Sequence, residues 1–365
     1  MYAHVHAFDG SLAQALRFGV TTELDMFADP ARMSTLRREA ASRSDVADIR
    51  SAGTGATAPG GHPCQMVGVL FAEFPTVSSP QQADGFVADR VAEGSDYLKV
   101  FSSSLPGEPE LPLLGAGTLQ ALVRAAHSRG LRTVAHATDQ PAALTALRVG
   151  VDGLGHLPID RPLDAELLDT LVQTGAFVVP TLGLLESLCQ IHTGMPLLHD
   201  ERMTTLLDGG QAEGLAEVMG PAPEPSYRAQ YAKEMVAPVR RAGVPVLAGT
   251  DSPAPGLAHG ASLHRELELL VDAGMSPSDA LASATSVPAD CFGLTDRGRV
   301  QPGMRADLLL VEGDPTREIT DTRSIVAVYR GGVAVSSGCR RRHRRARRLR
   351  RHSCATSRRR GENLT

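Results

Sequence analysis

Short runs rich in β-branched residues alternate with helical segments from residue 1 to about residue 292. This alternation is typical of consecutive β-α-β units, in which parallel strands form one sheet and helices pack on it. Eight runs with alternating helices favour a closed (β/α)8 barrel over an open doubly wound sheet. No Gly-x-Gly-x-x-Gly segment follows the first run, so a dinucleotide-binding fold has no support. The predicted strands are Ala3–His6, Val20–Met26, Ile49–Gly53, Tyr97–Phe101, Arg132–His136, Gly153–His156, Phe177–Thr181 and Val244–Thr250.

The helical segments between these runs carry recognisable ends. The segment 164–174 starts with Asp164, which we expect to be its N-cap, and Gly175 follows its last residue. The segment 119–129 follows a Gly and a Thr that could cap it, and Gly130 ends it.

The pattern changes after the barrel. Residues 294–338 contain short strands separated by turn signals, and we interpret them as a partial β-sandwich formed by the C-terminal segment. We therefore predict an α/β chain with a TIM-type barrel over residues 1–293, the small partial sandwich over 294–338, and a disordered Arg-rich tail over 339–365.

Charge is distributed unevenly along the chain. Residues 340–365 carry twelve Arg and one acid, so that this segment has a charge of +11 and the rest of the chain −15, which together give the net charge of −4. An acidic body is not typical of a nucleic-acid-binding protein, so any nucleic-acid contact would involve only the tail. A frameshifted reading of the gene is our preferred explanation of the tail.

Several totals bear on location and partners. No run of about 18 apolar residues occurs, which argues against a membrane span. The start, Met1-Tyr2-Ala3-His4, lacks the features of a secretory signal, and five cysteines are scattered without a CxxC pair. We expect a cytoplasmic protein that acts on a small-molecule substrate, and a homo-oligomer is compatible with the sequence.

Two histidines close the first predicted strand, in His4-Val5-His6. Residues two apart on a strand point to the same face, so both imidazoles can reach one ion. Taken alone the pair is a weak signal, because two polar surface histidines would give the same letters.

Other metal-binding residue types end other predicted strands. His136 ends the fifth, His156 ends the sixth, and Asp251 follows the eighth. In a parallel barrel the carboxyl ends of all strands open onto one face, so we expect these side chains to converge there. Core histidines would be spread along the strands instead.

Lys99 lies within an apolar predicted strand. The chain contains only one other lysine, Lys233. Burial disfavours the ammonium, and a neutral amine can add CO₂ to give a carbamate, an anion that can bridge two cations. Arginine cannot do this chemistry. The alternative is a lysine that pairs with an acid such as Glu23 or Asp25.

These residues and their order resemble the metal-ligand set of the amidohydrolase superfamily, in the style of its imidazolonepropionase-like and prolidase-like metal-dependent hydrolases. The resemblance covers about residues 3–335. Other segments that carry it are Phe18-Gly19-Val20-Thr21-Thr22, Gly60-Gly61-His62, Ala248-Gly249-Thr250-Asp251-Ser252, Ser262-Leu263-His264-Arg265-Glu266-Leu267 and Pro302-Gly303-Met304-Arg305-Ala306-Asp307-Leu308.

The resemblance implies a two-metal hydrolase of an amide, peptide or cyclic-amide C–N bond. Two divalent ions would activate a water and polarise the substrate carbonyl. Zinc is the metal we expect first, with Mn, Fe or Co as alternatives. Asp251 would act as the proton shuttle, and His62 would contact the substrate or the oxyanion. The implied metal ligands are His4, His6, Lys99 as its carbamate, His136, His156 and Asp251.

Three alternatives stay open. A one-metal aminohydrolase that deaminates a heterocycle would leave Lys99 structural, although Asp139 stands where deaminases of the superfamily tend to have Glu. Members of the superfamily usually carry sandwich strands before the first barrel strand, so we expect that about fifty residues are absent at the start, and an inactive truncated remnant is a second alternative. A nucleic-acid-associated protein that uses its tail is the third.

Overall fold

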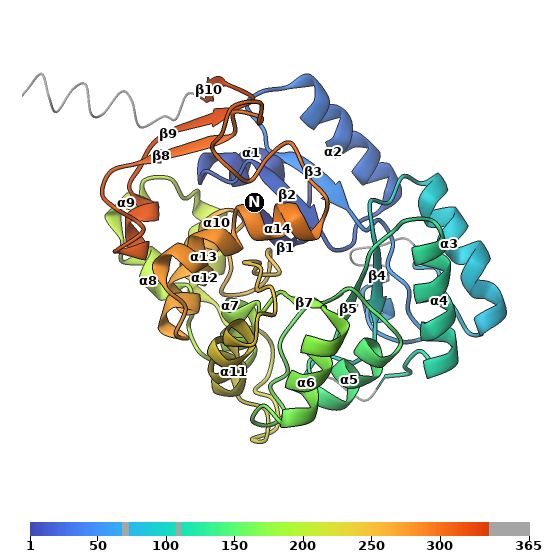
Figure 1. Ribbon diagram of the computed structural model, residues 1–365. Coiled ribbons are helices and arrows are strands. Elements are labelled where there is room, and N and C mark those ends of the chain that lie inside the picture. The colour runs from blue at the N-terminus through green and yellow to red at the C-terminus, as the bar shows by residue number, and fades with distance from the viewer. Residues whose placement is uncertain (68–72, 107–110, 336–365) are drawn as a thin grey trace, which may run out of the picture.

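The computed structural model of the chain describes residues 1–67, 73–106 and 111–335 (Figure 1). In this part of the chain, parallel strands form two sheets in the orders β1-β2-β3 and β4-β5-β6-β7. They correspond to the first seven predicted strands. Their bounds are β1 Tyr2–Val5, β2 Thr22–Asp25, β3 Asp48–Ser51, β4 Leu98–Phe101, β5 Thr133–His136, β6 Gly153–Leu154 and β7 Phe177–Val178.

Short extended segments join the two sheets into a closed ring. The predicted eighth strand, Val244–Thr250, lies between β7 and β1 and forms no regular ladder, in part because Pro245 has no N–H to donate. Backbone hydrogen bonds still hold it on both sides: the Leu247 amide donates to Val178 at 2.8 Å, and the Ala3 amide donates to Ala248 at 2.9 Å. The isolated parallel bridges are Ala56–Val100, Val178–Val246 and Val5–Ser252.

Helices surround these strands in a ring that is seen end-on in Figure 1. The helices that follow the strands in turn are α1 Ser11–Arg17, α2 Pro30–Ser42, α3 Ala83–Ala92, α4 Ala116–Ser128, α5 Gln140–Arg148, α6 Ala165–Thr174, α11 Ala229–Arg241 and α12 Ala261–Asp272. Shorter elements are α7 Leu182–Leu188, α8 Met195–Leu198, α9 Glu201–Thr204, α10 Gly209–Ala216, α13 Pro277–Ser283, α14 Ser286–Cys291 and the 3₁₀ turns η1 Cys64–Met66, η2 Pro80–Gln82 and η3 Ile319–Arg323. This arrangement is the predicted (β/α)8 barrel.

Helix ends follow the local sequence in one case and depart from it in another. Asp164 caps α6 by accepting the Leu167 amide at 2.9 Å, and Gly175 ends the helix with a φ of 66°, as predicted. The predicted threonine cap of the segment 119–129 was wrong: α4 starts three residues earlier, behind Gly115, and Thr118 lies inside it.

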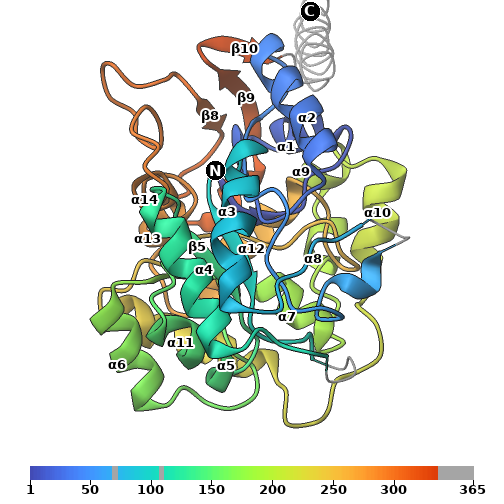
Figure 2. The same cartoon turned by 90° about the vertical axis from the view of Figure 1, so that its right-hand side faces the viewer.

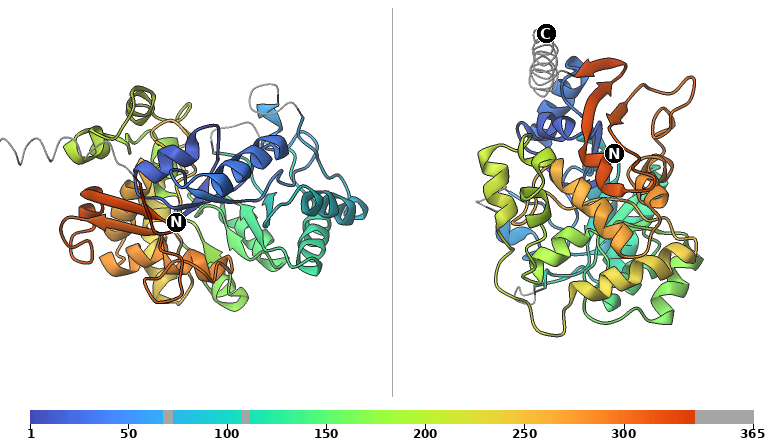
Figure 3. Two further views of the ribbon diagram at one scale, coloured as in Figure 1. Left: turned by 90° about the horizontal axis from the view of Figure 1, so that it is seen from above. Right: turned by 90° about the vertical axis from the view of Figure 1, so that its left-hand side faces the viewer.

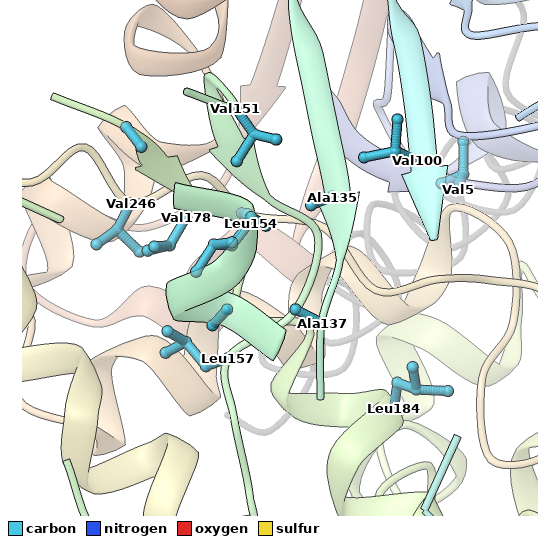
Figure 4. Packing of buried hydrophobic residues seen from close by; sticks show 14 of the residues in the cluster. Val5, Val100, Ala135, Ala137, Val151, Leu154, Leu157, Val178, Leu184 and Val246 are labelled. Atoms are coloured by element: carbon cyan, nitrogen blue, oxygen red, sulfur yellow. The ribbon is translucent and has the colours of Figure 1, made fainter. Parts of the chain in front are cut away.

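Apolar side chains fill two layers. Inside the ring, Leu24, Val134 and Leu247 belong to one buried cluster. Between strands and helices, Val100, Ala135 and residues from the neighbouring strands form the larger cluster, part of which Figure 4 shows. Alternate residues of one strand therefore serve the two layers.

The amino-terminal end of the barrel is closed by the residue after α14. The Phe292 ring lies 5.0 Å from the Tyr97 ring and 5.3 Å from the Phe177 ring. The opposite, carboxyl-terminal end is where the predicted site residues meet.

The segment after the barrel forms an antiparallel sheet in the order β10-β9-β8, with β8 Leu308–Val311, β9 Ile325–Arg330 and β10 Val333–Val335. It lies beside α1 and α2, as Figures 2 and 3 show. Arg330 reaches from this sheet to the last turn of α2, where its guanidinium donates to the Ala40 carbonyl at 2.7 Å. The predicted tail 339–365 falls outside the described residues. Among the helices that the structure describes, none combines the length and the apolar character needed to cross a membrane.

Candidate active site

A β-bulge in β1 turns both histidines of His4-Val5-His6 toward the barrel interior. Tyr2 pairs with Glu23 and Val5 pairs with Asp25, so β1 contains one residue more than β2 between these pairs. Tyr2 and Val5 both belong to the outer apolar layer. A bulge re-aims side chains in this way and is common beside active sites.

Asp251 meets both of these histidines. Its Oδ1 lies 2.9 Å from Nε2 of His4 and 2.8 Å from Nε2 of His6. Asp251 adopts a φ of 66°, a left-handed conformation that is unusual for a residue with a side chain. These three side chains offer ligand atoms that lie within 4.8 Å of one another, close enough to hold one ion.

Lys99 points into the same space from β4. Its side chain is 1% exposed, and its Nζ lies 3.5 Å from Nε2 of His4. Gly155 leaves the room for it, because a Cβ at this position would lie 2.7 Å from the Lys99 Nζ and 3.2 Å from Cε1 of His4. Glu23 and Asp25, the acids considered as partners of Lys99, form no hydrogen bond with it within the described residues and have other partners.

His136 and His156 form the other half of the site. Nε2 of His156 lies 3.0 Å from Nδ1 of His136, and the His4 and His156 rings are 4.9 Å apart. Nδ1 of His156 lies 2.8 Å from the hydroxyl of Thr181. The two pairs of histidines are therefore neighbours around one buried space.

His62 reaches this space from the loop after β3. Its ring stacks on that of His136 at 5.0 Å, and its Nδ1 lies 2.7 Å from the amide nitrogen of Gln65. Because an amide nitrogen only donates, Nδ1 accepts and the proton of His62 resides on Nε2. The structure thus brings all the predicted site residues together.

The electrostatics leave electron pairs available on these groups. Burial lowers the pKa of His4 to about 4, and it lowers the pKa values of His136 and His156 well below their usual range. Burial also lowers the pKa of Lys99 to about 8. For Asp251, burial raises the pKa, but the two imidazoles beside it lower the pKa by more, to well below its usual range.

The hydrogen-bond partners of His6 bear on whether a cation fits between these groups. Nδ1 of His6 lies 3.3 Å from the Phe27 carbonyl, which can only accept, so a neutral His6 carries its proton there. Its Nε2 lone pair then faces the ionised Asp251 oxygen, and two acceptors in contact need a positive charge between them. The direction of the His6 pKa agrees with this: burial lowers it, but Asp251 raises it by more, so a positive charge is favoured at this point. The donor set therefore fits a metal ion.

Several residues that support the site were not predicted from the sequence. Thr181 contacts His156, Glu266 accepts the amide of Leu182, the residue after Thr181, and Gly155 faces Lys99. Glu23 and His259 form a fully buried pair at 2.5 Å on the outer side of β2. The strand-end position of Thr181 was a readable signal. Glu266 lies in the segment Ser262–Leu267 that carries the family resemblance, but the sequence assigned it no role.

Comparisons with known proteins show which family the chain is similar to. The sequence profile of the amidohydrolase family matches residues 3–335. A Mycobacterium tuberculosis protein of undescribed function is 27% identical over 244 residues, or 64% of this chain and 56% of that protein, so the chain spans about half the length of this relative. Imidazolonepropionase of Cereibacter sphaeroides is 36% identical over 88 residues, which cover 23% of this chain and 22% of that protein.

Solved structures share the fold. A Xaa-Pro dipeptidase with bound methionine in its active site superposes with a TM-score of 0.72 at 21% identity, covering 92% of this chain and 85% of that chain. A putative prolidase from Bifidobacterium longum gives a TM-score of 0.70 at 24% identity, covering 92% and 79%. Because the family profile extends over nearly all the described residues and the barrel is shared, the chain belongs to the amidohydrolase family.

Proposed function

We propose that this chain is a metal-dependent hydrolase that cleaves an amide, peptide or cyclic-amide C–N bond. One observation carries the proposal: side chains from both ends and the middle of the barrel sequence meet around a single buried space. Asp251 lies within hydrogen-bonding distance of two histidines, and a second histidine pair adjoins them.

We propose that the site holds two cations rather than one. His4, His6 and Asp251 would hold the first, and His136 and His156 the second. Lys99 would bridge them as its carbamate, which its burial and its lowered pKa favour. We infer zinc for such a nitrogen and oxygen donor set, with Mn, Fe or Co as alternatives. When bound, these ions lower the pKa of a coordinated water and polarise the scissile carbonyl.

The protein side chains supply the proton transfers and the orientation of the substrate. Asp251 uses one oxygen, Oδ1, toward both imidazoles, and its other oxygen is the proton acceptor that we assign to the attacking water. The same oxygen returns the proton to the leaving nitrogen. His62, whose ring stacks on that of His136, is the residue that we assign to the carbonyl oxygen of the substrate.

The surroundings favour a substrate with an apolar group beside the scissile bond. Phe27, Phe74 and Phe101 form a buried cluster next to the site. The Phe27 ring lies 4.1 Å from His6 and the Phe101 ring lies 5.4 Å from His62. The names of the similar structures, a Xaa-Pro dipeptidase and a putative prolidase, support dipeptides and N-acyl amino acids as the first compounds to assay.

Deamination of a heterocycle by a one-metal site is the second candidate, because short segments of the chain resemble adenine deaminases. One from Ligilactobacillus salivarius is 36% identical over 67 residues, which cover 18% of this chain and 12% of that protein. Against it, Asp139 caps α5 by accepting the Ala142 amide at 2.8 Å, so its carboxylate is engaged in the helix end.

The experiment has two arms. Zinc per chain is counted by mass spectrometry, and a panel of dipeptides, N-acyl amino acids, cyclic amides and adenine is assayed. Two ions and hydrolysis of an amide support the first candidate, whereas one ion and release of ammonia from adenine support the second. A chain that binds no metal and hydrolyses nothing contradicts both.

The carbamate is tested separately with the two lysines of the chain. After equilibration with ¹³CO₂, the wild type should give a carbamate carbon signal that disappears in Lys99→Arg. Lys233→Arg is the matched control, because Lys233 is partly exposed and pairs with Asp272 at 3.6 Å. A signal that Lys99→Arg keeps would refute the bridge.

A further inference from the structure

Helix α7 begins next to His156, and the side chain of the residue at its N-cap position does not cap it. Thr181 occupies the N-cap position, where a threonine side chain usually accepts a backbone amide of the first turn. Here Thr181 has φ 51° and ψ 45°, and its hydroxyl forms no such bond. A left-handed conformation is rare for a β-branched residue and persists only where its surroundings impose it.

The hydroxyl of Thr181 instead determines the proton position on His156. It donates to the Pro180 carbonyl at 2.8 Å, so toward His156 it can only accept. Nδ1 of His156, 2.8 Å away, must therefore carry the ring proton. Its Nε2 keeps a lone pair, which is directed at Nδ1 of His136 at 3.0 Å.

Glu266 of α12 supplies the cap that Thr181 does not. Its Oε1 accepts the Leu182 amide at 2.9 Å and its Oε2 accepts the Gly183 amide at 3.0 Å. These are the first two amides of α7, which have no partner inside the helix. Both Glu266 and Thr181 are 0% exposed, so water cannot replace either contact.

We propose that Glu266 is a positioning residue, which caps α7 in place of Thr181 and so frees the threonine hydroxyl to fix His156 as a ligand for the second metal ion. The carboxyl group of a residue in another helix can satisfy the amides of α7 while the backbone of Thr181 stays left-handed. That backbone turns the hydroxyl toward His156 rather than toward the helix. The metal-binding consequence rests on the proposed function, whereas the ring tautomer does not.

The test reads the tautomer first, on metal-free protein labelled with ¹⁵N-histidine. Nitrogen shifts and couplings should show His156 of the wild type with its proton on Nδ1. Thr181→Val keeps the shape of the side chain and removes the acceptor, so His156 should become a mixture of the two tautomers. Thr181→Ser keeps the hydroxyl and should retain the wild-type tautomer.

Glu266→Gln tests the cap. The amide group offers only one acceptor oxygen for two backbone donors, so the His156 tautomer should become mixed here too. Zinc titration should then show the second ion bound about 10- to 100-fold more weakly and the first unchanged. Glu186→Gln is the matched control, since Glu186 lies in α7 and contacts Arg265 of α12 at 3.4 Å without capping the helix.

Circular dichroism establishes that each variant is folded. Glu266→Asp, which keeps both carboxyl oxygens but shortens their reach, replaces Glu266→Gln if the latter does not fold. The proposal is overturned if the folded Glu266 variant keeps the wild-type tautomer, or if Glu186→Gln changes it equally. Because the tautomer is read without metal or substrate, a chain that proves not to be a hydrolase fails the proposed function and leaves this result interpretable.

Discussion

Replacing Gly155 by alanine tests how closely the barrel is packed around Lys99. The added Cβ would lie 2.7 Å from the Lys99 Nζ, against an ordinary contact of about 3.5 Å or more. The ammonium can move because it ends a flexible chain, but the Ala135 carbonyl oxygen and Cε1 of His4, both at 3.2 Å, leave the methyl group little other room. The lysine must therefore retreat from the shared space.

The expected cost in stability is small and the expected cost to the site is large. Overpacking a core costs about 1–3 kcal/mol, and the flexible partner places this case at about 1–2 kcal/mol. With an unfolding entropy of about 2 cal/mol/K per residue, a domain of this size should lose only about 1–3 °C in Tm. The proposed bridging carbamate on Lys99, by contrast, would be displaced, so at least one of the two proposed zinc ions should be lost.

Calorimetry gives the change in Tm, and mass spectrometry of dialysed protein gives zinc per chain. Gly85→Ala is the matched control: it adds the same methyl group within α3, where nothing lies within 4 Å of it, and should leave zinc content unchanged. A Gly155→Ala chain with the zinc content of the wild type would show that Lys99 does not occupy this space when metal is bound.

Three further predictions concern the metal, the ion pairs of Asp48 with Arg297 and Arg305, and the proton shuttle. Zinc at about 100 times its dissociation constant should stabilise the fold by about 2.7 kcal/mol over a chelated sample, and equal Tm values in calorimetry would contradict the metal site. Burial raises the pKa of Asp48, but hydrogen bonds from Arg297 and Arg305 at 2.6 and 2.8 Å lower it by more, to about 2. Its ionised form should thus add about 2 kcal/mol of stability that is present above about pH 4 and lost as the pH falls toward 2, and urea melts of Asp48→Asn should lack this acid-side loss. Asp251→Asn should lower turnover of the substrate found by screening at least about 100-fold with a smaller change in KM, whereas an unchanged turnover number would remove Asp251 as the proton shuttle.

Much of the barrel could be predicted because local pattern and tertiary structure agree. The strand from Tyr97 to Phe101 alternates between the two apolar layers, and Asp164 and Gly175 mark both ends of α6. The predicted strand bounds differ from the structure where few ladder hydrogen bonds form. The predicted sixth strand extends to His156, but its ladder stops at Leu154, since the chain bends there to bring the histidine beside His136.

The convergence of the site residues was predictable for a topological reason: the carboxyl ends of parallel strands share one rim. The details that aim the side chains were not. A one-residue bulge in β1, the left-handed backbone of Thr181 and the cap from Glu266 depend on contacts between segments far apart in the chain. No periodicity in a single sequence records such contacts.

The closure of the barrel has a consequence for how the molecule would fail. The seam between β1 and the segment that follows β7 joins residues as much as 250 positions apart. One isolated bridge, a few backbone hydrogen bonds and the hydroxyl of Tyr2 secure it. His4 and His6 lie on the β1 side of this seam, and Asp251 lies on the other side. A local opening of this seam would separate His4 and His6 from Asp251 while the rest of the barrel stays folded. Activity should therefore be lost at a lower temperature than the global fold.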